Sequence, residues 1–329
     1  MITTEIEKIL KKQHYFIVGE HSAVQICRWT KKSLRQEDVC YKEKFYGIKS
    51  HLCCQMSPWI GCENKCIHCW RSIEFSFNQF LDKNKTDRPK EIIDECILAQ
   101  KKLLEGFKTD PKSKKKQLSK ANAEKWKEAQ EPMNFAISLL GESTLYNNIG
   151  EFIEELRGRK KTSFLVTNGL HPEKIKELNK KNQLPTQLYV SVNTPNKKMY
   201  KEFHRSSVKD AWERLNETLE ILPVLKCRTV FRINLIKYLN MNDKCIKEFA
   251  EMIKKAQSTF VELKGYMSVG FARQRLGYER MPRHEDVTEF AKRLEKELEN
   301  EKYKILDGHE RSCAIVLGKD KRELKIKDV

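Results

Sequence analysis

The sequence predicts an α/β fold, a single barrel built from six βα units. Short apolar segments rich in β-branched and aromatic residues alternate with helical segments along most of the 329 residues. Their spacing of about 25 to 45 residues is typical of parallel strands joined by right-handed crossovers. A hydrophobic content of 39% is sufficient for one core of this kind.

Six strands are expected at residues 52–56, 134–140, 163–167, 187–193, 229–236 and 260–264. Helices are expected at residues 1–13, 88–107, 149–158, 172–180, 209–222, 243–256 and 284–300. Pro89 suits the first turn of the second of these helices, because a first-turn amide has no intrahelical partner. At the end of the chain, Asp307-Gly308 lies between two apolar runs and predicts a hairpin turn.

This pattern divides the chain into three regions. Residues 1–60 form an N-terminal extension, residues 50–300 form the barrel, and residues 301–329 form a hairpin tail. A lysine-rich insertion at residues 108–131, with a short helix at 121–129, interrupts the barrel. It is either a solvated surface loop or an arm that contacts phosphates.

The charge of the chain indicates a polyanionic partner. Lys and Arg number 64 against 46 Asp and Glu, which gives a net charge of +18. Nucleic acid fits this excess better than a small acidic substrate does, although a merely soluble lysine-rich protein is the alternative. The N-terminus has no apolar signal segment, and no run of 18 apolar residues occurs, so we expect a cytoplasmic protein without membrane contact. Cytoplasmic thiols stay reduced, which makes metal binding the expected use of clustered cysteines.

The strongest chemical signal is Cys62-x3-Cys66-x2-Cys69. A structural zinc site normally takes four ligands in two pairs, whereas here three cysteines occur together. A [4Fe-4S] cluster with three thiolates keeps one iron open for another ligand. The spacing, with His68 just before the last cysteine, resembles the radical S-adenosylmethionine superfamily. That resemblance implies S-adenosylmethionine (SAM) on the open iron and its cleavage to a 5′-deoxyadenosyl radical.

A second set of cysteines, Cys27, Cys40 and Cys53, occurs at x12 intervals. We interpret it as the thiolates of a second [4Fe-4S] cluster, with single buried cysteines as the alternative. Cys54 is expected to point away from this set, because it follows Cys53 directly and successive side chains of a strand point to opposite faces. The remaining cysteines fit the core of helices or strands: Cys96, Cys227, Cys245 and Cys313.

Polar residues recur at the carboxyl ends of the expected strands, where parallel α/β folds bind ligands. Gly141-Glu142 resembles the superfamily's glycine-glutamate motif that meets the cofactor's ammonium group, and a charge at a helix N-terminus is the alternative role of Glu142. Taken singly, the others fit turns or helix caps equally well. The expected cofactor-binding residues are His68, Gly141, Glu142, Asn168, Ser191, Asn193 and Met267.

Arginines interleave with aromatic residues after the last expected strand. Guanidinium groups for phosphates and aromatic faces for splayed bases are what single-stranded RNA recognition requires. A generic basic loop is the alternative. The expected RNA-binding residues are Arg273, Arg275, Arg280 and Arg283.

The motifs together resemble one family, the archaeal-type tRNA 4-demethylwyosine synthases. The resemblance rests on the x12 cysteine set, Cys40-Tyr41-Lys42, Ser57-Pro58-Trp59, Gly141-Glu142-Ser143-Thr144-Leu145-Tyr146 and Met281-Pro282-Arg283-His284-Glu285. A different radical enzyme, such as a methylthiotransferase, and a zinc-binding RNA protein are the competing interpretations.

The family resemblance implies a specific reaction. The substrate is tRNA with N1-methylguanosine at position 37 of tRNA-Phe, beside the anticodon, and pyruvate supplies two carbons. The adenosyl radical takes hydrogen from the N-methyl group, the carbon radical adds to pyruvate, and loss of the carboxyl carbon with ring closure gives 4-demethylwyosine. Cys62, Cys66 and Cys69 hold the SAM cluster, and Cys27, Cys40 and Cys53 hold the cluster that chelates pyruvate.

Two further expectations follow from the same resemblance. Lys42 either forms a Schiff base with pyruvate or pairs with its carboxylate. The enzyme is expected to be a monomer that receives electrons from a separate flavodoxin or ferredoxin, since the chain has no room for a flavodoxin-like domain.

Overall fold

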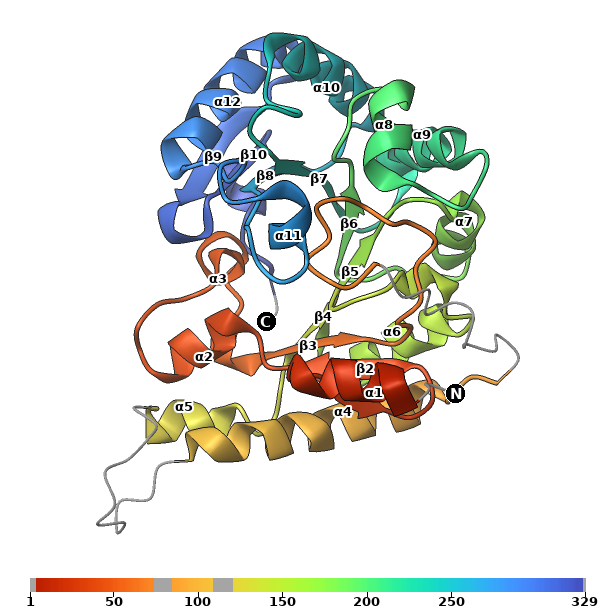
Figure 1. Ribbon diagram of the computed structural model, residues 1–329, viewed down its shortest axis with the longest axis vertical. Coiled ribbons are helices and arrows are strands. Elements are labelled where there is room, and N and C mark those ends of the chain that lie inside the picture. Colours follow the sequence, from red (N-terminus) through yellow and green to blue (C-terminus); the bar gives the residue numbers. More distant parts are fainter. Residues whose placement is uncertain (1–3, 74–84, 109–120, 328–329) are drawn as a thin grey trace. The chain divides into compact units, whose positions relative to one another are not determined.

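Helices and strands alternate along the described chain. The computed structural model of the protein covers residues 4–73, 85–108 and 121–327 in describable detail (Figure 1). The chain forms two compact units. Unit 1 is drawn from Met1–Gly61, Phe77–Leu165 and Lys325–Val329, and unit 2 from Cys62–Ser76 and Val166–Leu324. Residues 1–3 of the expected first helix and most of the lysine-rich insertion (109–120) lie outside the described residues.

Unit 1 contains the N-terminal extension and the first parallel strands. Its elements are α1 (Thr4–Lys12), β1 (Phe16–Val18), β2 (Ser22–Gln25), α2 (Arg28–Leu34), α3 (Tyr41–Tyr46), β3 (Cys53–Ser57), α4 (Pro89–Leu104), α5 (Ala123–Glu128), β4 (Asn134–Ile137), α6 (Ile149–Gly158) and β5 (Thr162–Thr167), whose last two residues count with unit 2.

In unit 1 the strands follow the order β1-β2-β3-β4-β5. β3, β4 and β5 are parallel, and the β1–β2 hairpin adds to β3 in antiparallel register. All four residues of β4 are buried, as expected for a strand covered on both faces. α4 begins with Pro89 and packs its buried Ile92, Ile93 and Cys96 in the interior beside β1, β2 and β3.

Unit 2 contains the remaining elements. They are α7 (Pro172–Lys180), β6 (Gln187–Ser191), α8 (Lys197–His204), α9 (Ala211–Ile221), β7 (Arg228–Leu235), α10 (Asp243–Ala256), β8 (Phe260–Gly265), α11 (Ala272–Leu276), α12 (His284–Glu297), β9 (Lys304–His309) and β10 (Ala314–Gly318).

The strands of unit 2 follow the order β6-β7-β8-β10-β9. β6, β7 and β8 are parallel, and β10 adds to β8 in antiparallel register. α12 packs on β8, β9 and β10 (Figure 1). The side chains of Asn196 and Asn242 accept hydrogen bonds from backbone amides in the first turns of α8 and α10, which fixes where these helices begin.

The expected alternation of strands and helices is confirmed, and α6, α7 and α10 have the expected bounds. Three differences concern unit 2. α8 and α11 were not expected, because both are short and lie among many basic residues. The tail does form a hairpin, but Asp307-Gly308 lies inside β9, where Gly308 pairs with Ile315. The turn instead falls at residues 310–313, where Cys313 has a φ of 46°.

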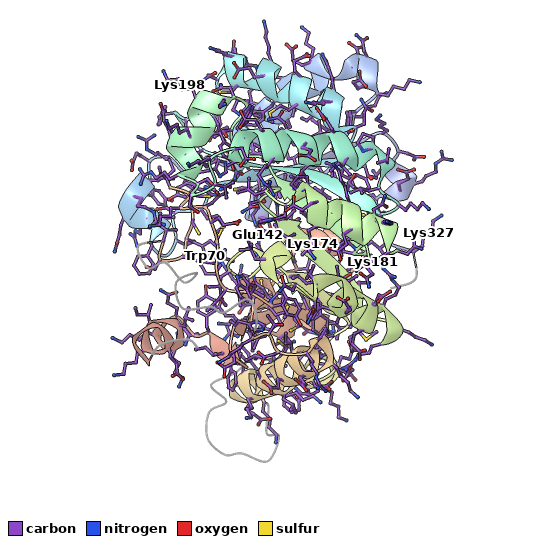
Figure 2. All side chains as sticks on the ribbon, turned by 90° about the vertical axis from the view of Figure 1, so that its right-hand side faces the viewer. Trp70, Glu142, Lys174, Lys181, Lys198 and Lys327 are labelled. Atoms are coloured by element: carbon purple, nitrogen blue, oxygen red, sulfur yellow. The ribbon has the colours of Figure 1, made fainter. Side chains whose placement is uncertain are left out.

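Basic side chains of unit 2 differ in exposure (Figure 2). Lys198 on α8 is exposed, whereas Lys174 on α7 is partly buried and pairs with Glu177 at 2.7 Å. Within the described residues, no helix combines the length and the apolar character that a membrane crossing requires.

Asn240 connects the ends of two parallel strands in unit 2. Its buried amide donates to the carbonyl oxygens of Asn193 and Asn234, both at 2.9 Å, and accepts from the amide of Ile236 at 2.7 Å. Removing the amide leaves three buried backbone groups without that partner.

We therefore expect Asn240→Ala to lower the free energy of unfolding by about 3 kcal/mol. Urea denaturation followed by circular dichroism measures this loss. Asn216→Ala is the matched control, because Asn216 is a half-buried residue inside α9 where alanine suits the helix. Equal midpoints for the two variants would contradict the role of Asn240.

Candidate functional site

The three cysteines of the strongest motif lie on one irregular segment of unit 2, residues 62–71, here called the cluster loop. Cys62, Cys66 and Cys69 are half-buried. Burial and the neighbouring Cys62 and Cys69 raise the pKa of the Cys66 thiol well above its usual value. Three thiolates held this close repel one another in a poorly solvated place, and bound iron relieves that cost. The donor set therefore fits an iron–sulfur cluster.

The C-terminal end of α8 holds the cluster loop on one side. The amides of Lys65 and Ile67 donate to the carbonyl oxygens of His204 and Phe203, at 2.9 and 3.0 Å. The amide of Ser207 donates to the carbonyl oxygen of Glu63 at 3.0 Å. Backbone groups at and after the end of α8 thus serve as hydrogen-bond partners for backbone groups of the cluster loop.

The segment around α11 holds the loop on the other side. The Arg275 guanidinium donates to the carbonyl oxygens of Ile67, Cys69 and Arg71. The amide of Phe271 donates to the carbonyl oxygen of Trp70 at 2.9 Å. Gly270, at a φ of +55°, lies so close that a Cβ there would stand 2.2 Å from the Trp70 oxygen.

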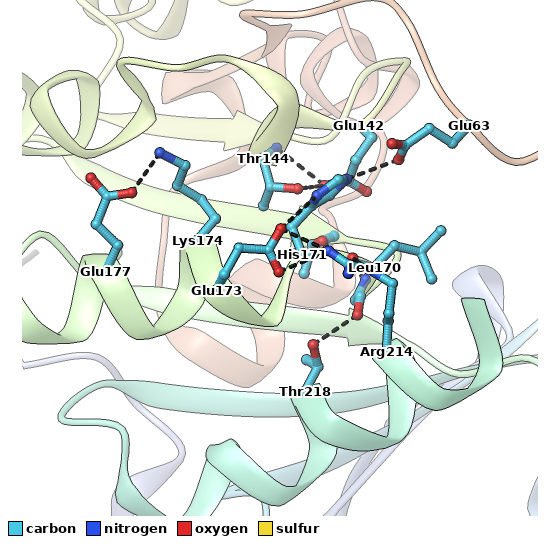
Figure 3. A network of polar contacts seen from close by, with 12 residues as sticks. Glu63, Glu142, Thr144, Leu170, His171, Glu173, Lys174, Glu177, Arg214 and Thr218 are labelled. Carbon is cyan, nitrogen blue, oxygen red and sulfur yellow. Dashed lines mark hydrogen bonds and ion pairs between the residues drawn. The ribbon is translucent and has the colours of Figure 1, made fainter. Parts of the chain in front are cut away.

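A third connection joins the loop to α7 (Figure 3). Glu63 Oε2 lies 2.9 Å from His171 Nε2, just before the first turn of α7. Arg214 of α9 continues this network, because it donates to Glu173 and to the carbonyl oxygen of Leu170.

His68 packs inside unit 2. Its ring stacks on Phe203 with centroids 4.9 Å apart, and its Nε2 lies 3.5 Å from the Asn193 amide. Burial, followed by Arg275 and Arg71, lowers the pKa of His68 to about 4. Burial and His68 lower the pKa of His204 to about 3. Both imidazoles are therefore neutral at physiological pH.

Several buried polar atoms of unit 2 have no hydrogen-bond partner among the described residues. Those on the cluster loop and just after β6 and β8 include both amide atoms of Asn64, Nδ1 of His68, Oγ1 of Thr194 and Oγ of Ser268. Buried polar atoms without partners are rare and require an explanation. A polar ligand bound at the cluster loop and the strand ends would satisfy them, so the residues present fit SAM.

The other expected cofactor residues of unit 2 lie at strand ends, as predicted. Asn193 follows β6, and its Oδ1 accepts from the amide of Asn234 at 3.1 Å. Asn168 accepts from the amide of Leu170 at 3.0 Å, which is the local turn role that the sequence left open. Ser191 ends β6, and Met267 follows β8.

Gly141 and Glu142 lie in unit 1, after β4. Gly141 has a φ of +74°, and a Cβ on it would stand 2.2 Å from the carbonyl oxygen of Trp59. The amide of Glu142 donates to the carbonyl oxygen of Gly61 at 2.7 Å. The buried Glu142 carboxylate accepts from the Thr144 amide and hydroxyl, so it caps the short helical turn that follows.

The second cysteine set also comes together, within unit 1. Cys27 precedes α2, Cys40 precedes α3 and Cys53 begins β3. Burial and the neighbouring Cys27 raise the pKa of the Cys53 thiol to about 12, Cys40 adds to that rise, and Lys42 opposes it. These electrostatic effects put the three thiols and the Lys42 ammonium in one neighbourhood.

Ser50 holds the segments that carry these thiols. Its hydroxyl accepts from the amide of Cys40 at 2.8 Å and donates to Glu43 at 2.6 Å, and its carbonyl oxygen accepts from Thr30 at 3.0 Å. Nothing in the sequence pattern indicated Ser50, because one serine between helices is unremarkable.

Lys42 is a buried lysine, with 7% of its surface exposed. Its Nζ lies 4.7 Å from the centre of the Phe164 ring on β5. Buried lysines are uncommon in proteins, so the burial of Lys42 makes it a candidate functional residue.

The remaining cysteines do not join either set. Cys54 is buried close to Cys96, as expected for core residues, and Cys245 is buried in α10. Cys227 and Cys313 lie just outside strands instead of within them. Among the residues that the structure describes, no group of three His, Cys, Asp or Glu side chains is arranged around a single metal ion.

The arginines expected to bind RNA differ in exposure. Arg273 and Arg283 are exposed, and Arg280 is partly buried. The position of Arg275 differs from the one expected, since its guanidinium donates to three carbonyl oxygens of the cluster loop.

Family models match most of the chain. The model of the radical SAM superfamily matches residues 56–253, and the model described as wyosine base formation matches residues 255–319. The match, the βα units and the three-cysteine loop define a radical SAM enzyme with the partial (β/α)6 TIM-type barrel of that superfamily.

Individual relatives narrow the assignment. The S-adenosyl-L-methionine-dependent tRNA 4-demethylwyosine synthase of Pyrococcus abyssi is 44% identical over 317 residues, which cover 96% of this chain and 89% of the relative. The enzyme of the same description from Methanocaldococcus jannaschii is 36% identical over 99% of this chain and its own full length. The chain therefore belongs to the tRNA 4-demethylwyosine synthase family.

Two solved structures of TYW1 resemble this chain over its whole length. A structure of TYW1 with a lysine-pyruvate adduct bound superimposes with a TM-score of 0.82 at 35% identity, covering 100% of this chain and 99% of that one. A crystal structure of archaeal TYW1 gives a TM-score of 0.75 at 32% identity, with the same coverage of both chains.

The Arg275 guanidinium should be needed to hold the cluster loop, because it contacts three of the loop's carbonyl oxygens. Arg275→Lys keeps the positive charge but loses the fork that reaches three carbonyl oxygens. We expect this variant to lose the iron that the cluster loop binds after anaerobic reconstitution, because the loosened loop no longer holds its cluster. Iron analysis measures this.

Arg273→Lys is the matched control, since Arg273 lies on α11 with an exposed side chain. It should keep its iron. Full iron loading in Arg275→Lys, with weakened tRNA binding instead, would assign Arg275 to RNA after all.

Proposed function

We propose that this enzyme condenses pyruvate with N1-methylguanosine at position 37 of tRNA-Phe to form 4-demethylwyosine. The observation that carries the proposal is the buried Lys42 beside the Cys27, Cys40 and Cys53 thiols in unit 1. Two sets of three thiols and a buried amine are what a radical step on one substrate and the presentation of a second substrate require.

Each cysteine set would hold a [4Fe-4S] cluster. Cys62, Cys66 and Cys69 would hold the one that binds SAM, and Cys27, Cys40 and Cys53 would hold the second. Bound to reduced iron, SAM supplies a 5′-deoxyadenosyl radical, which is chemistry that protein side chains do not provide. Asn64, Thr194 and Ser268 offer buried polar atoms that would orient the cofactor.

Lys42 is proposed to bind pyruvate covalently. Its amine would add to the keto carbon and release water, which leaves a Schiff base. The Phe164 ring beside Nζ and the surrounding burial would keep water away from that bond. The solved relative with a lysine-pyruvate adduct supports this assignment. Pairing between the ammonium group and the pyruvate carboxylate is the alternative that the test below separates.

The tRNA would supply the carbon that reacts. Its N-methyl group would lose a hydrogen atom, and the resulting carbon would form a bond to the keto carbon of pyruvate. The bond to the carboxylate would then break, and the carboxyl carbon would leave with the unpaired electron, which restores the imine. The guanine amino group would replace the Lys42 amine on that carbon, which frees Lys42, and loss of a proton would complete the tricyclic base. Exposed Arg273 and Arg283 in unit 2 would contact the tRNA phosphates.

We propose a monomer in the cytoplasm that takes low-potential electrons from a separate flavodoxin or ferredoxin.

The role of Lys42 can be tested by trapping. Incubation with pyruvate and borohydride should add a reduced pyruvate to Lys42, detected by peptide mass spectrometry. Lys42→Arg should lose the adduct and base formation at least about 100-fold, because a guanidinium is not a nucleophile at neutral pH. Trapping on another lysine such as Lys44 would refute this assignment.

The two cysteine sets are expected to have separable roles. Cys62→Ala should abolish SAM cleavage, whereas Cys27→Ala should retain cleavage uncoupled from tRNA and lose the tricyclic base. Chromatography of 5′-deoxyadenosine and mass analysis of digested tRNA measure the two outputs. Cys245→Ala is the control that should keep both, since Cys245 is buried in α10 outside either set. Base formation by Cys27→Ala would disprove the second centre.

A further inference from the structure

We infer that His204 tunes the SAM cluster by donating a hydrogen bond from Nδ1 to the sulfur of Cys66. His204 is the last residue of α8, 138 positions from Cys66 in sequence, and the two atoms lie 3.2 Å apart. The motif itself gives no indication of this contact. His204 is a positioning and tuning residue, because it acts through a cluster ligand.

The direction of the hydrogen bond follows from the chemistry of the ligand. A cysteine bound to iron carries no proton, so its sulfur can only accept. The imidazole proton must therefore lie on Nδ1, and Nε2 is left as an acceptor. In the described residues Nε2 has no hydrogen-bond partner, so nothing there competes for the proton on Nδ1.

The surroundings hold the imidazole in this orientation. The ring of His204 stacks on Tyr200, one turn earlier in α8, with centroids 4.4 Å apart. The backbone carbonyl of His204 accepts from the amide of Lys65, and that of Phe203 accepts from Ile67. His204 thus contacts the loop through its main chain and through its side chain, and Phe203 adds a main-chain contact on the other side of Cys66.

A hydrogen bond to a ligand sulfur stabilises the more negative, reduced state of an iron–sulfur cluster. Reduction of this cluster takes one electron from a low-potential donor, such as a flavodoxin or dithionite. The Nδ1–H group therefore raises the reduction potential and eases electron entry. This inference depends on the SAM cluster alone, and neither Lys42 nor the second cysteine set enters it.

The test compares His204→Phe, which keeps the stacked ring but lacks the donor, with His204→Gln, which keeps a side-chain N–H. Anaerobic redox titration is followed by EPR, using the signal that changes when SAM is added. We expect His204→Phe to lower the equilibrium constant for one-electron reduction about tenfold, equal to about 59 mV. His204→Gln should recover most of this loss.

His309→Phe is the matched control, because it removes another buried histidine of unit 2 whose ring bonds Ser312 instead of a cysteine. Its potential should equal that of the unaltered enzyme. An unchanged potential in His204→Phe, or equal shifts in the Phe and Gln variants, would overturn the inference.

A second measurement needs no substitution at all. The unaltered holoenzyme, labelled with nitrogen-15 histidine, should show a nitrogen coupling to the reduced SAM cluster in pulsed EPR. Absence of that coupling would overturn the inference even if His204→Phe failed to bind iron.

Discussion

The cluster loop depends on backbone hydrogen bonds that come from other parts of unit 2. The three cysteines lie within eight positions on a segment that is neither helix nor strand. The amide of Cys69 donates to the carbonyl oxygen of Cys66 within the loop, but the loop lacks the regular ladder of backbone hydrogen bonds that a helix or strand has, and burying unpaired backbone groups would be costly. The end of α8 and the Arg275 guanidinium supply partners for these groups. The geometry of the cysteines is thus set by residues more than a hundred positions away.

The backbone that carries Cys27, Cys40 and Cys53 is held in place in a different way. These cysteines lie far apart in sequence, and each stands where a helix or a strand of unit 1 begins. Helices and strands pair most of their own backbone N–H and C=O groups by hydrogen bonds. The segments that carry these cysteines therefore need few additional hydrogen bonds to hold them together. Ser50 provides such bonds through Cys40, Glu43 and Thr30. Lys42 follows Cys40 within the first turn of α3, which brings a buried amine close to the thiols.

The sequence predicted those helices and strands that residues within the element itself specify. β-Branched runs located β5 and β7, and Pro172 located the start of α7. The same reasoning misplaced the turn of the tail, because Asp-Gly favours a turn only where its neighbours do not pair as strands. The sequence contained no sign of the loop contacts of Arg275 for a related reason. Its position among basic residues favoured RNA binding, whereas its guanidinium also reaches a loop two hundred positions earlier. Contacts of that range leave no periodic signal.

The β9–β10 hairpin has a consequence for the behaviour of the protein in a crowded cell. Without β10, the last parallel strand of unit 2 would present a row of unsatisfied amides and carbonyls to any other chain. β10 pairs with this edge, and β9 becomes the edge strand of the sheet. β9 begins with the exposed Lys304, and its pairing with β10 shifts register between Val316 and Leu317. A charged, irregular border is a poor template for intermolecular β-sheet. The tail thereby protects unit 2 against aggregation.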